Sequence, residues 1–285
     1  MKSLVIGAGG MLGSALMRVF EGIGADRAER EGMRALDACD AGAVASLIEE
    51  SAAEAVLFPA AQPHVDLCER EPEATAAINV EAPVAAARLC AERRLRFVFY
   101  SSDYVFDGQK GRYTETDFLK PLSVYGLQKL EAERRILQVC PSALVLRTSG
   151  MYGNETVAKN YALRLIAALR EGKEVKAVTD QAYSPTWSDD LAKMTKEALE
   201  KGARGVYHAT GSKRLTRFEW AQLIATSFAL DASLVKPALT AEFDSAGLAP
   251  RPADSSLDSS KLAALIGRAP LSPEEGLAGL RAQLA

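Results

Sequence analysis

Short apolar runs alternate with longer segments of helical periodicity through the first half of the chain. The runs are short and almost continuously apolar, which is typical of buried strands in a parallel sheet. They cover Ser3–Ile6, Ala55–Pro59, Arg96–Tyr100 and Ala143–Arg147. The segments between them predict helices at Met11–Gly22, Ala41–Ser51, Pro72–Arg93 and Val124–Gln138. Strands separated by helices in this way predict a parallel sheet with helices on both faces.

After about Tyr152 this rhythm changes. Further elements are predicted as helices at Asn160–Glu171, Asp189–Glu200 and Arg217–Phe228, a strand at Gly205–Ala209 and a loop at Ala246–Asp258. The predicted fold class is therefore α/β. Residues 1–152 are predicted to form a doubly wound parallel sheet of the Rossmann type, which is a fold of dinucleotide-binding domains. Residues 153–285 are predicted to form a smaller α/β substrate-binding domain, and a strand near 205–210 can rejoin the first sheet.

The composition of the 285 residues is ordinary for a globular protein. It is 48% hydrophobic and 25% charged, and its net charge of −3 gives no general footprint for nucleic acid. No apolar run approaches the roughly 18 residues that span a bilayer. Met1-Lys2-Ser3 leads directly into the first predicted strand, so we expect no signal peptide. The four cysteines form no C-x-x-C pair, and we expect a cytoplasmic protein with reduced cysteines.

The two histidines are far apart in the sequence. His64 lies in a predicted loop and is a weak candidate for a substrate contact, whereas His208 lies in a strand-like run and is expected to be structural. Without a cluster of ligands at zinc-like spacing, we expect no metal site.

Three glycines follow the first predicted strand with the spacing G-x-x-G-x-x-G. Glycine permits a tight turn and lets backbone N–H groups approach a pyrophosphate, and the helix that follows points its N-terminus at the anion. The position between a strand and a helix is the context that this motif requires. The loop therefore predicts a dinucleotide-binding site formed by Gly7, Gly10, Met11, Leu12 and Gly13.

A second motif places an acid–base pair on one helix. Tyr125 and Lys129 are four residues apart and so share one helical face. A neighbouring ammonium is expected to bring the tyrosine pKa closer to neutrality, which suits proton transfer, and Lys129 can also bond a cofactor ribose. Ser102 follows a strand end, where its hydroxyl can bind a substrate oxygen. The three residues predict hydride transfer on an alcohol or ketone.

The choice of nicotinamide cofactor depends on the end of the second strand. An acidic side chain there favours NAD through the ribose 2′-hydroxyl, and an arginine favours NADP through the 2′-phosphate. The segment Gly24–Arg30 contains both, and either Arg27 or Arg30 could hold the phosphate. NADPH is the expected cofactor, with NADH as the alternative.

Taken together, these strings resemble the extended short-chain dehydrogenases, and within them the dTDP-4-dehydrorhamnose reductase type. The resemblance extends over nearly the whole chain, and its most specific marker is the string S-S-D-Y-V-F-D-G at 101–108. It implies a catalytic trio of Ser102, Tyr125 and Lys129. It also implies cofactor contacts at Asp37, Cys39, Ala60, Ala61 and Asn79, and nucleotide-sugar contacts at Tyr104, Gln181 and Arg251, the last on the diphosphate.

Two departures keep other functions open. These reductases usually carry a tryptophan at Gly150, whose loss predicts a more open pocket beside Tyr125, and the loop Gln62–His64 also differs. The regulatory β subunit of methionine adenosyltransferase shares the main markers and lacks that tryptophan. The predicted function is reduction of a 4-keto nucleotide sugar in dTDP-rhamnose biosynthesis. The alternatives are a non-catalytic NADP-binding subunit and an epimerase or dehydratase, for which Asp103 is the candidate acid. The sequence allows a homodimer.

Overall fold

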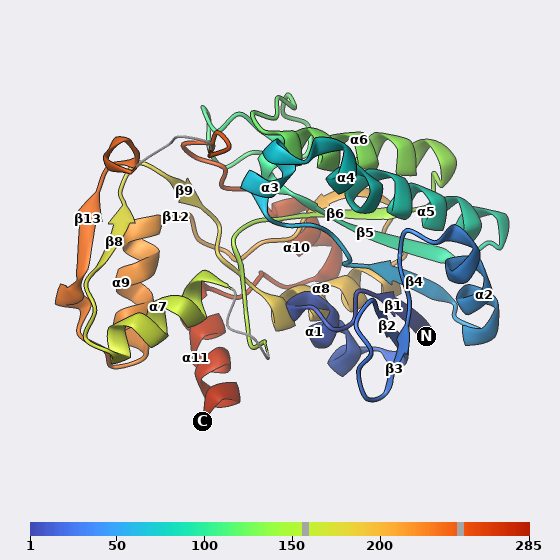
Figure 1. Ribbon diagram of the computed structural model, residues 1–285, viewed down its shortest axis with the longest axis horizontal. Coiled ribbons are helices and arrows are strands. Elements are labelled where there is room, and N and C mark those ends of the chain that lie inside the picture. The colour runs from blue at the N-terminus through green and yellow to red at the C-terminus, as the bar shows by residue number, and fades with distance from the viewer. Residues whose placement is uncertain (156–159, 244–247) are drawn as a thin grey trace.

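The computed structural model describes residues 1–155, 160–243 and 248–285. A seven-stranded parallel sheet lies at the centre of the molecule (Figure 1). Its strands are β1 (Lys2–Ile6), β2 (Glu21–Asp26), β3 (Met33–Ala35), β4 (Ala55–Phe58), β5 (Arg96–Ser102), β6 (Leu144–Thr148) and β11 (Gly205–His208). Their spatial order is β11-β6-β5-β4-β1-β2-β3, and all neighbours are parallel. The predicted doubly wound sheet is confirmed.

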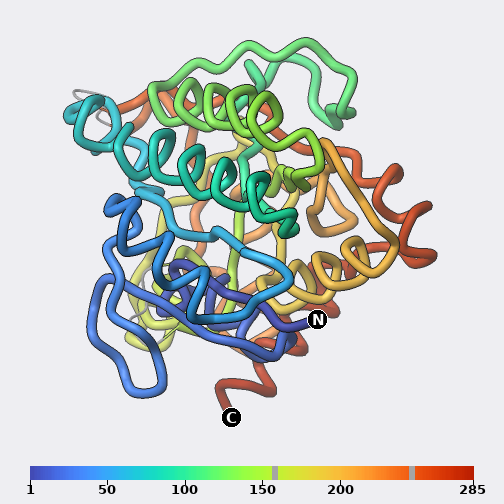
Figure 2. Tube along the Cα trace, turned by 90° about the vertical axis from the view of Figure 1, so that its right-hand side faces the viewer, coloured from blue at the N-terminus to red at the C-terminus, as the bar shows by residue number. Residues whose placement is uncertain are grey.

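Alternate residues of each central strand enter different cores. In β1, Leu4 and Ile6 face one cluster and Val5 the other; in β5, Phe97 faces the first and Val98 the second. The first face is covered by α2 (Ala41–Ser51), α5 (Ala82–Glu92) and α6 (Val124–Val139). The second is covered by α1 (Met11–Val19), α8 (Ser188–Glu200) and α10 (Ser260–Ile266), so helices enclose both faces (Figure 2).

The predicted helix Met11–Gly22 is too long. The helix α1 ends at Val19, and β2 starts at Glu21 and pairs with β1. Gly22 lies opposite Ser3 in this pair, and a Cβ on Gly22 would overlap the Ser3 backbone. Strand pairing thus outweighs the helical pattern at this end.

The predicted helix Pro72–Arg93 is a composite. After the short α3 (Val65–Arg70), it comprises α4 (Pro72–Ala76), a π-helical turn (Ala77–Glu81) and α5. The wide turn precedes Pro83, which has no N–H to donate within the helix. The turn contains Asn79 and places it in the interior of the molecule.

Segments from the second half of the chain complete both cores. β11 adds to the sheet beside β6, and α8 and α10 cover one of its faces. A separate cluster is formed by α7 (Tyr161–Arg170), α9 (Arg217–Ser227) and α11 (Pro273–Leu284). Around it lie short strand pairs, β7 (Met151–Tyr152) with β10 (Thr186–Trp187), β8 (Val175–Val178) with β13 (Val235–Ala238), and β9 (Ala182–Tyr183) with β12 (Leu215–Thr216). Residues 246–247 of the predicted loop Ala246–Asp258 lie outside the described residues.

Candidate active site

The glycine loop connects the carboxyl end of β1 to α1. Gly7 has φ +97°, and a Cβ on it would lie 2.7 Å from the Ala60 nitrogen, while a Cβ on Gly13 would overlap the Gly7 carbonyl oxygen. These two glycines are needed by the fold itself. At Gly10 the nearest atom to a Cβ would be 3.5 Å away, so packing leaves free space there. Since α1 has no side-chain cap, its first N–H groups are available to an anion in that space.

The acidic residue at the end of the second strand is Asp26. Its Oδ2 accepts the Gly9 N–H at 2.9 Å and its Oδ1 accepts the Ala28 N–H at 3.1 Å. The side chain of Arg30 lies over the same glycine as Asp26, and Arg27 is exposed in the turn that follows β2. The carboxylate is therefore already hydrogen-bonded to backbone, and the assignment of Arg27 or Arg30 to a 2′-phosphate stays a prediction.

The loop after β4 lies against this glycine turn. Ala60 contacts Gly7. Ala61 precedes Gln62, whose backbone is hydrogen-bonded to the side chain of Asn79. The buried Asn79 accepts the Gln62 N–H through Oδ1 and donates through Nδ2 to Gln128 Oε1, both at 2.8 Å. Asn79 thus fixes the loop against α6, and cofactor contacts at these three predicted positions stay predictions.

The turn before α2 holds the other two predicted cofactor residues. Cys39 donates its N–H to Asp37 Oδ1 at 2.9 Å and is exposed. Burial of the thiol, followed by the charge of Asp37, raises the pKa of Cys39, so the thiol is neutral at neutral pH. Contact between this turn and an adenine ring stays a prediction.

Ser102, Tyr125 and Lys129 come from two adjacent elements. Ser102 is the last residue of β5, Tyr125 is the second residue of α6, and Lys129 lies one turn further along α6. The Ser102 hydroxyl donates to Asp103 Oδ1 at 3.0 Å. Lys129 is buried, donates to the Tyr100 carbonyl oxygen at 3.0 Å, and has its Nζ 5.9 Å from the centre of the Tyr125 ring. The three side chains thus meet at the carboxyl end of β5.

The expected fall in the pKa of Tyr125 is wrong. Burial raises the pKa of Tyr125 and the charge of Asp103 adds to the rise, while hydrogen bonding to Ser102 opposes it. The Lys129 ammonium donates to the Tyr100 carbonyl, and its Nζ lies 5.9 Å from the centre of the Tyr125 ring. Burial lowers the pKa of Lys129 to about 8, against the charge of Glu133. At neutral pH the pair is therefore a protonated phenol beside a mostly protonated amine, which suits a proton donor.

Asp103 is buried and fully used by neighbouring hydroxyls. Its carboxylate accepts Ser102 at 3.0 Å, Ser149 at 2.7 Å and Ser255 at 2.5 Å. Burial raises the pKa of Asp103, against the hydrogen bonds from these serines. The residue ties the end of β5 to two other segments, and it also lines the pocket described below.

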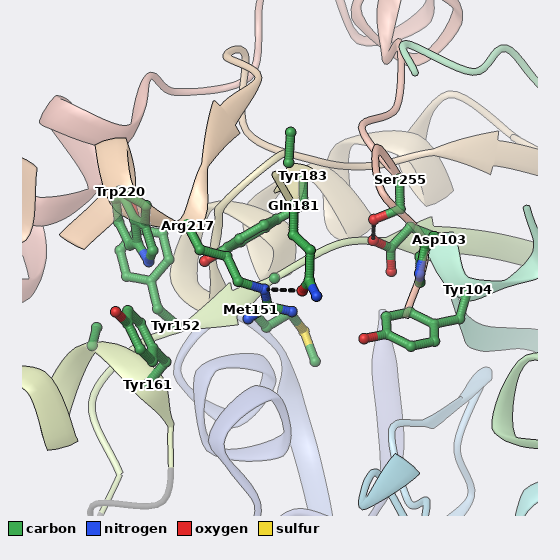
Figure 3. A pocket seen from close by; sticks show the side chains of 14 residues that line it. Asp103, Tyr104, Met151, Tyr152, Tyr161, Gln181, Tyr183, Arg217, Trp220 and Ser255 are labelled. Atoms are coloured by element: carbon green, nitrogen blue, oxygen red, sulfur yellow. Dashed lines mark hydrogen bonds between the residues drawn. The ribbon is translucent and has the colours of Figure 1, made fainter. Parts of the chain in front are cut away.

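A pocket lies between the segment that follows β5 and the helices α7 and α9 (Figure 3). Ser102, Tyr125 and Lys129 are not among its lining residues, but Asp103 and Tyr104, which follow Ser102 directly, are. Tyr104 and Gln181, two of the predicted substrate residues, line it, and the Tyr104 ring packs edge-on against Tyr125 with centroids 5.8 Å apart. Arg251 is not among its lining residues. It forms an ion pair with Asp66 at 2.9 Å and donates to the Ala249 carbonyl at 2.7 Å. Its contact with a diphosphate stays a prediction.

Gly150 lines the pocket, and a more open pocket beside Tyr125 stays a prediction. Gly150 has φ +48°, and a Cβ there would overlap the ring of Tyr183. The ring of Tyr183, which also lines the pocket, occupies the adjoining space. An aromatic face is therefore present in this wall, but it comes from β9.

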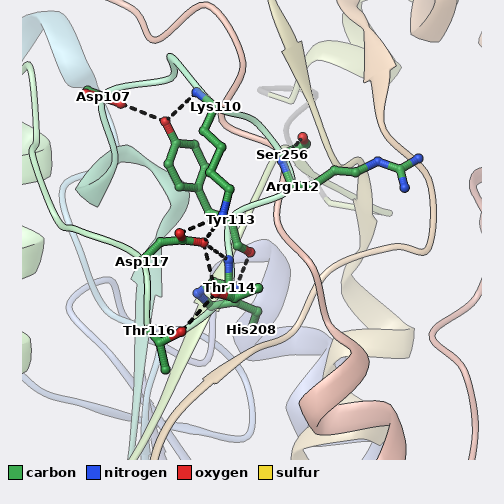
Figure 4. A network of polar contacts seen from close by, with 9 residues as sticks. All are labelled: Asp107, Lys110, Arg112, Tyr113, Thr114, Thr116, Asp117, His208 and Ser256. Carbon is green, nitrogen blue, oxygen red and sulfur yellow. Dashed lines mark hydrogen bonds and ion pairs between the residues drawn. The ribbon is translucent and has the colours of Figure 1, made fainter.

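The two histidines have different settings. His208 is buried, and its Nδ1 lies 2.9 Å from the Tyr113 carbonyl (Figure 4). Burial, followed by the charge of Arg147, lowers the pKa of His208 to about 3. His64 is exposed at the start of α3, and its N–H donates to Gln62 Oε1 at 3.2 Å. His208 is thus a neutral structural residue, while a substrate contact by His64 stays a prediction.

The described residues hold neither a metal-binding cluster nor a membrane-spanning helix. No group of three histidine, cysteine, aspartate or glutamate side chains is arranged to hold a metal ion. Among the described helices, none has the length and apolar character that crossing a bilayer requires.

Among the pocket-lining residues that the sequence did not predict, three bring polar or aromatic groups that bear on ligand binding. They are Tyr161 at the start of α7, Tyr183 in β9 and Arg217 at the start of α9. The pattern T-x-x-E at 216–219 could have placed Arg217 at the first helical position, since it forms a capping box in the structure. No sequence signal shows that these three segments meet in one pocket.

Comparison with known proteins matches the whole chain. The family model described as the RmlD substrate binding domain covers residues 1–285. The chain is 31% identical to a dTDP-4-dehydrorhamnose reductase of Aggregatibacter actinomycetemcomitans, over 99% of this chain and 98% of the relative. It is 34% identical to the methionine adenosyltransferase 2 subunit beta of Danio rerio, over 92% and 84%. The resemblance to this group of sequences is confirmed.

A solved structure supports the same grouping. The dTDP-4-dehydrorhamnose reductase of Bacillus anthracis, determined in complex with NADP, superposes with a TM-score of 0.90 at 26% identity. The alignment covers 99% of both chains. The fold shared with that reductase therefore includes the cluster of α7, α9 and α11 as well as the central sheet.

Proposed function

Because the chain belongs to the RmlD substrate-binding domain family, we propose that it is an NAD(P)H-dependent reductase of a 4-keto nucleotide sugar, similar to dTDP-4-dehydrorhamnose reductase. The observation that carries the proposal is the meeting of Ser102, Tyr125 and Lys129 at the carboxyl end of β5, beside a pocket lined by Tyr104. The β subunits share these markers, so the trio supports a reductase without excluding the partner subunit, and the assay below separates the two.

The roles of the trio follow from their settings. Tyr125 donates its phenolic proton to the keto oxygen, since its raised pKa keeps it protonated at neutral pH. Ser102 turns its hydroxyl from Asp103 to the same oxygen and orients it. Lys129 holds positive charge beside the phenol as the proton leaves, and so stabilises the phenolate.

The residues around the glycine loop fit a dinucleotide. The free space at Gly10 and the uncapped start of α1 match a pyrophosphate, and Arg30 beside Asp26 offers a cation for a 2′-phosphate. We therefore favour NADPH over NADH. When bound, the nicotinamide supplies the hydride. The proposed setting is the cytoplasm, and a homodimer is the assembly to test.

The second candidate is a non-catalytic regulatory subunit of a methionine adenosyltransferase. It is favoured by the identity to the Danio rerio β subunit and by Gly150. A dehydratase is not favoured, because the acid that it would need, Asp103, is held by three serine hydroxyls, and no observation favours an epimerase.

One experiment separates the two candidates. The purified protein is incubated with NADPH or NADH and a panel of 4-keto nucleotide sugars, and cofactor oxidation and product mass are followed. Turnover of any 4-keto sugar supports the reductase. No turnover, together with stoichiometric capture of a methionine adenosyltransferase from the native host, would establish the subunit instead.

A further inference from the structure

Arg217 extends from the first residue of α9 into the pocket (Figure 3). Its Nε donates to Gln181 Oε1 at 2.8 Å, and its guanidinium carbon lies 5.1 Å from the centre of the Tyr183 ring. Two other arginines of the second half, Arg214 and Arg251, each form an ion pair with an aspartate. Within the part of the chain that the structure describes, no carboxylate forms an ion pair with Arg217.

The polar groups around Arg217 leave donors rather than acceptors unsatisfied. The Tyr161 hydroxyl is buried and has no hydrogen-bond partner among the described residues. Gln181 uses its oxygen for Arg217 and its nitrogen for the Thr240 hydroxyl at 3.0 Å. The nearby Asp103 carboxylate already accepts three serine hydroxyls. A buried donor without a partner is costly, so these groups favour a ligand that brings acceptor oxygens.

We propose that Arg217, with the hydroxyl of Tyr161, forms an anion-binding subsite for charged oxygens of the nucleotide-sugar substrate. This rests on the proposed function, because it assigns the substrate to the same pocket. A guanidinium makes paired, charge-assisted hydrogen bonds to phosphate and carboxylate alike. The oxygens therefore belong either to the diphosphate or to a carboxylate on the sugar ring. Arg217 can take this role because its terminal nitrogens are free of carboxylates, whereas Arg251 is tied to Asp66.

The test is a binding titration that needs no turnover. Calorimetry with NADP⁺ present measures the affinity for dTDP and UDP, and for the matched pair UDP-glucose and UDP-glucuronate, which differ by one carboxylate. Arg217→Gln and Tyr161→Phe are compared with wild type. Arg281→Gln is the control, because Arg281 is exposed on α11 and donates to the Ser227 carbonyl at 3.0 Å. An unchanged stabilisation by NADP⁺ shows that each variant is folded.

The two sources of the anion give different results. A diphosphate contact makes Arg217→Gln bind dTDP or UDP about ten- to one-hundred-fold more weakly. A carboxylate contact leaves these nucleotides unchanged and abolishes a preference for UDP-glucuronate over UDP-glucose. The subsite is overturned if Arg217→Gln matches wild type with every probe, or if wild type binds none of them. Binding that depends on Arg217 without turnover of any 4-keto sugar would overturn the reductase alone.

Discussion

At the scale of single residues, Tyr125 is half-buried at the start of α6, with Ser102 beside it and Lys129 one helical turn away. Tyr125→Phe removes only the transferable proton and keeps the ring. We expect turnover of the 4-keto substrate to fall by on the order of 100- to 10,000-fold, the usual share of a general acid. Affinity for NADPH, measured by fluorescence titration, should stay near wild type. A variant with unimpaired turnover would exclude Tyr125 as the acid.

We expect Lys129 to make cofactor binding depend on pH. Burial lowers its pKa to about 8, with Glu133 opposing and the Cys68 thiol nearby. If the ammonium bonds the cofactor ribose, the affinity is present below pH 8 and is lost as the pH rises through that value. We expect the loss to approach about ten-fold per pH unit. Titrations of NADPH across this range measure it.

The control for this pH dependence is Lys129→Met. This variant should bind NADPH weakly at every pH, with no fall around pH 8. A wild-type affinity that stays constant through pH 9, or a variant that keeps the same fall, would show that another group titrates.

At the scale of elements, the turn between β1 and α1 contains glycines with two different roles: Gly10 leaves space for a ligand, whereas Gly13 is required by backbone packing. Gly10 has φ −79° and ψ 170°, which valine can adopt, and free space around its Cβ position. Gly10→Val should therefore fold with a melting temperature close to wild type but lose the stabilisation that NADP⁺ gives to the native state. Thermal melts with and without NADP⁺ measure both effects.

Gly13→Val is the matched comparison within the same turn. Its Cβ would overlap the backbone of Gly7, so we expect a variant that is several kcal/mol less stable or does not fold. If Gly10→Val keeps the full response to NADP⁺, the anion does not occupy this loop.

At the scale of the whole molecule, the two halves of the chain are interleaved. β11 from the second half completes the sheet, and α8 and α10 cover its second face. Removing the second half would therefore expose an apolar sheet face. We infer that the sheet with its covering helices and the separate cluster of α7, α9 and α11 unfold as one cooperative unit.

Both tryptophans pack in the cluster formed by α7, α9 and α11, so their fluorescence can test whether that cluster unfolds together with the sheet. Trp187 and Trp220 pack in that cluster, whereas the glycine loop connects β1 and α1, whose buried side chains belong to the cores of the sheet. Tryptophan fluorescence and far-ultraviolet circular dichroism should give one coincident thermal transition, and NADP⁺ should shift both equally. Two separate transitions, or a shift in the dichroism alone, would show that the clusters unfold independently.

The sequence by itself determined the elements with strong local patterns. Continuous apolar runs identified β1, β4, β5 and β6, because strands buried on both faces admit few polar residues. The spacing of the glycines and of Tyr125 and Lys129 identified their turn and helix face, because both relations are local. β2 was missed in part, since Gly22 and Gly24 carry no apolar signal and the strand exists through its pairing with β1 and β3.

Only the tertiary structure decided how distant segments share the pocket. That Tyr183 fills the space beside Gly150, that Asp66 holds Arg251 and that Arg217 faces Tyr161 are relations between side chains far apart in the sequence. The same holds for the Tyr125 pKa, which burial raises where the spacing to Lys129 alone predicts a fall. Local spacing fixes which residues share a helix face, whereas desolvation and pairing depend on what the rest of the chain packs against them.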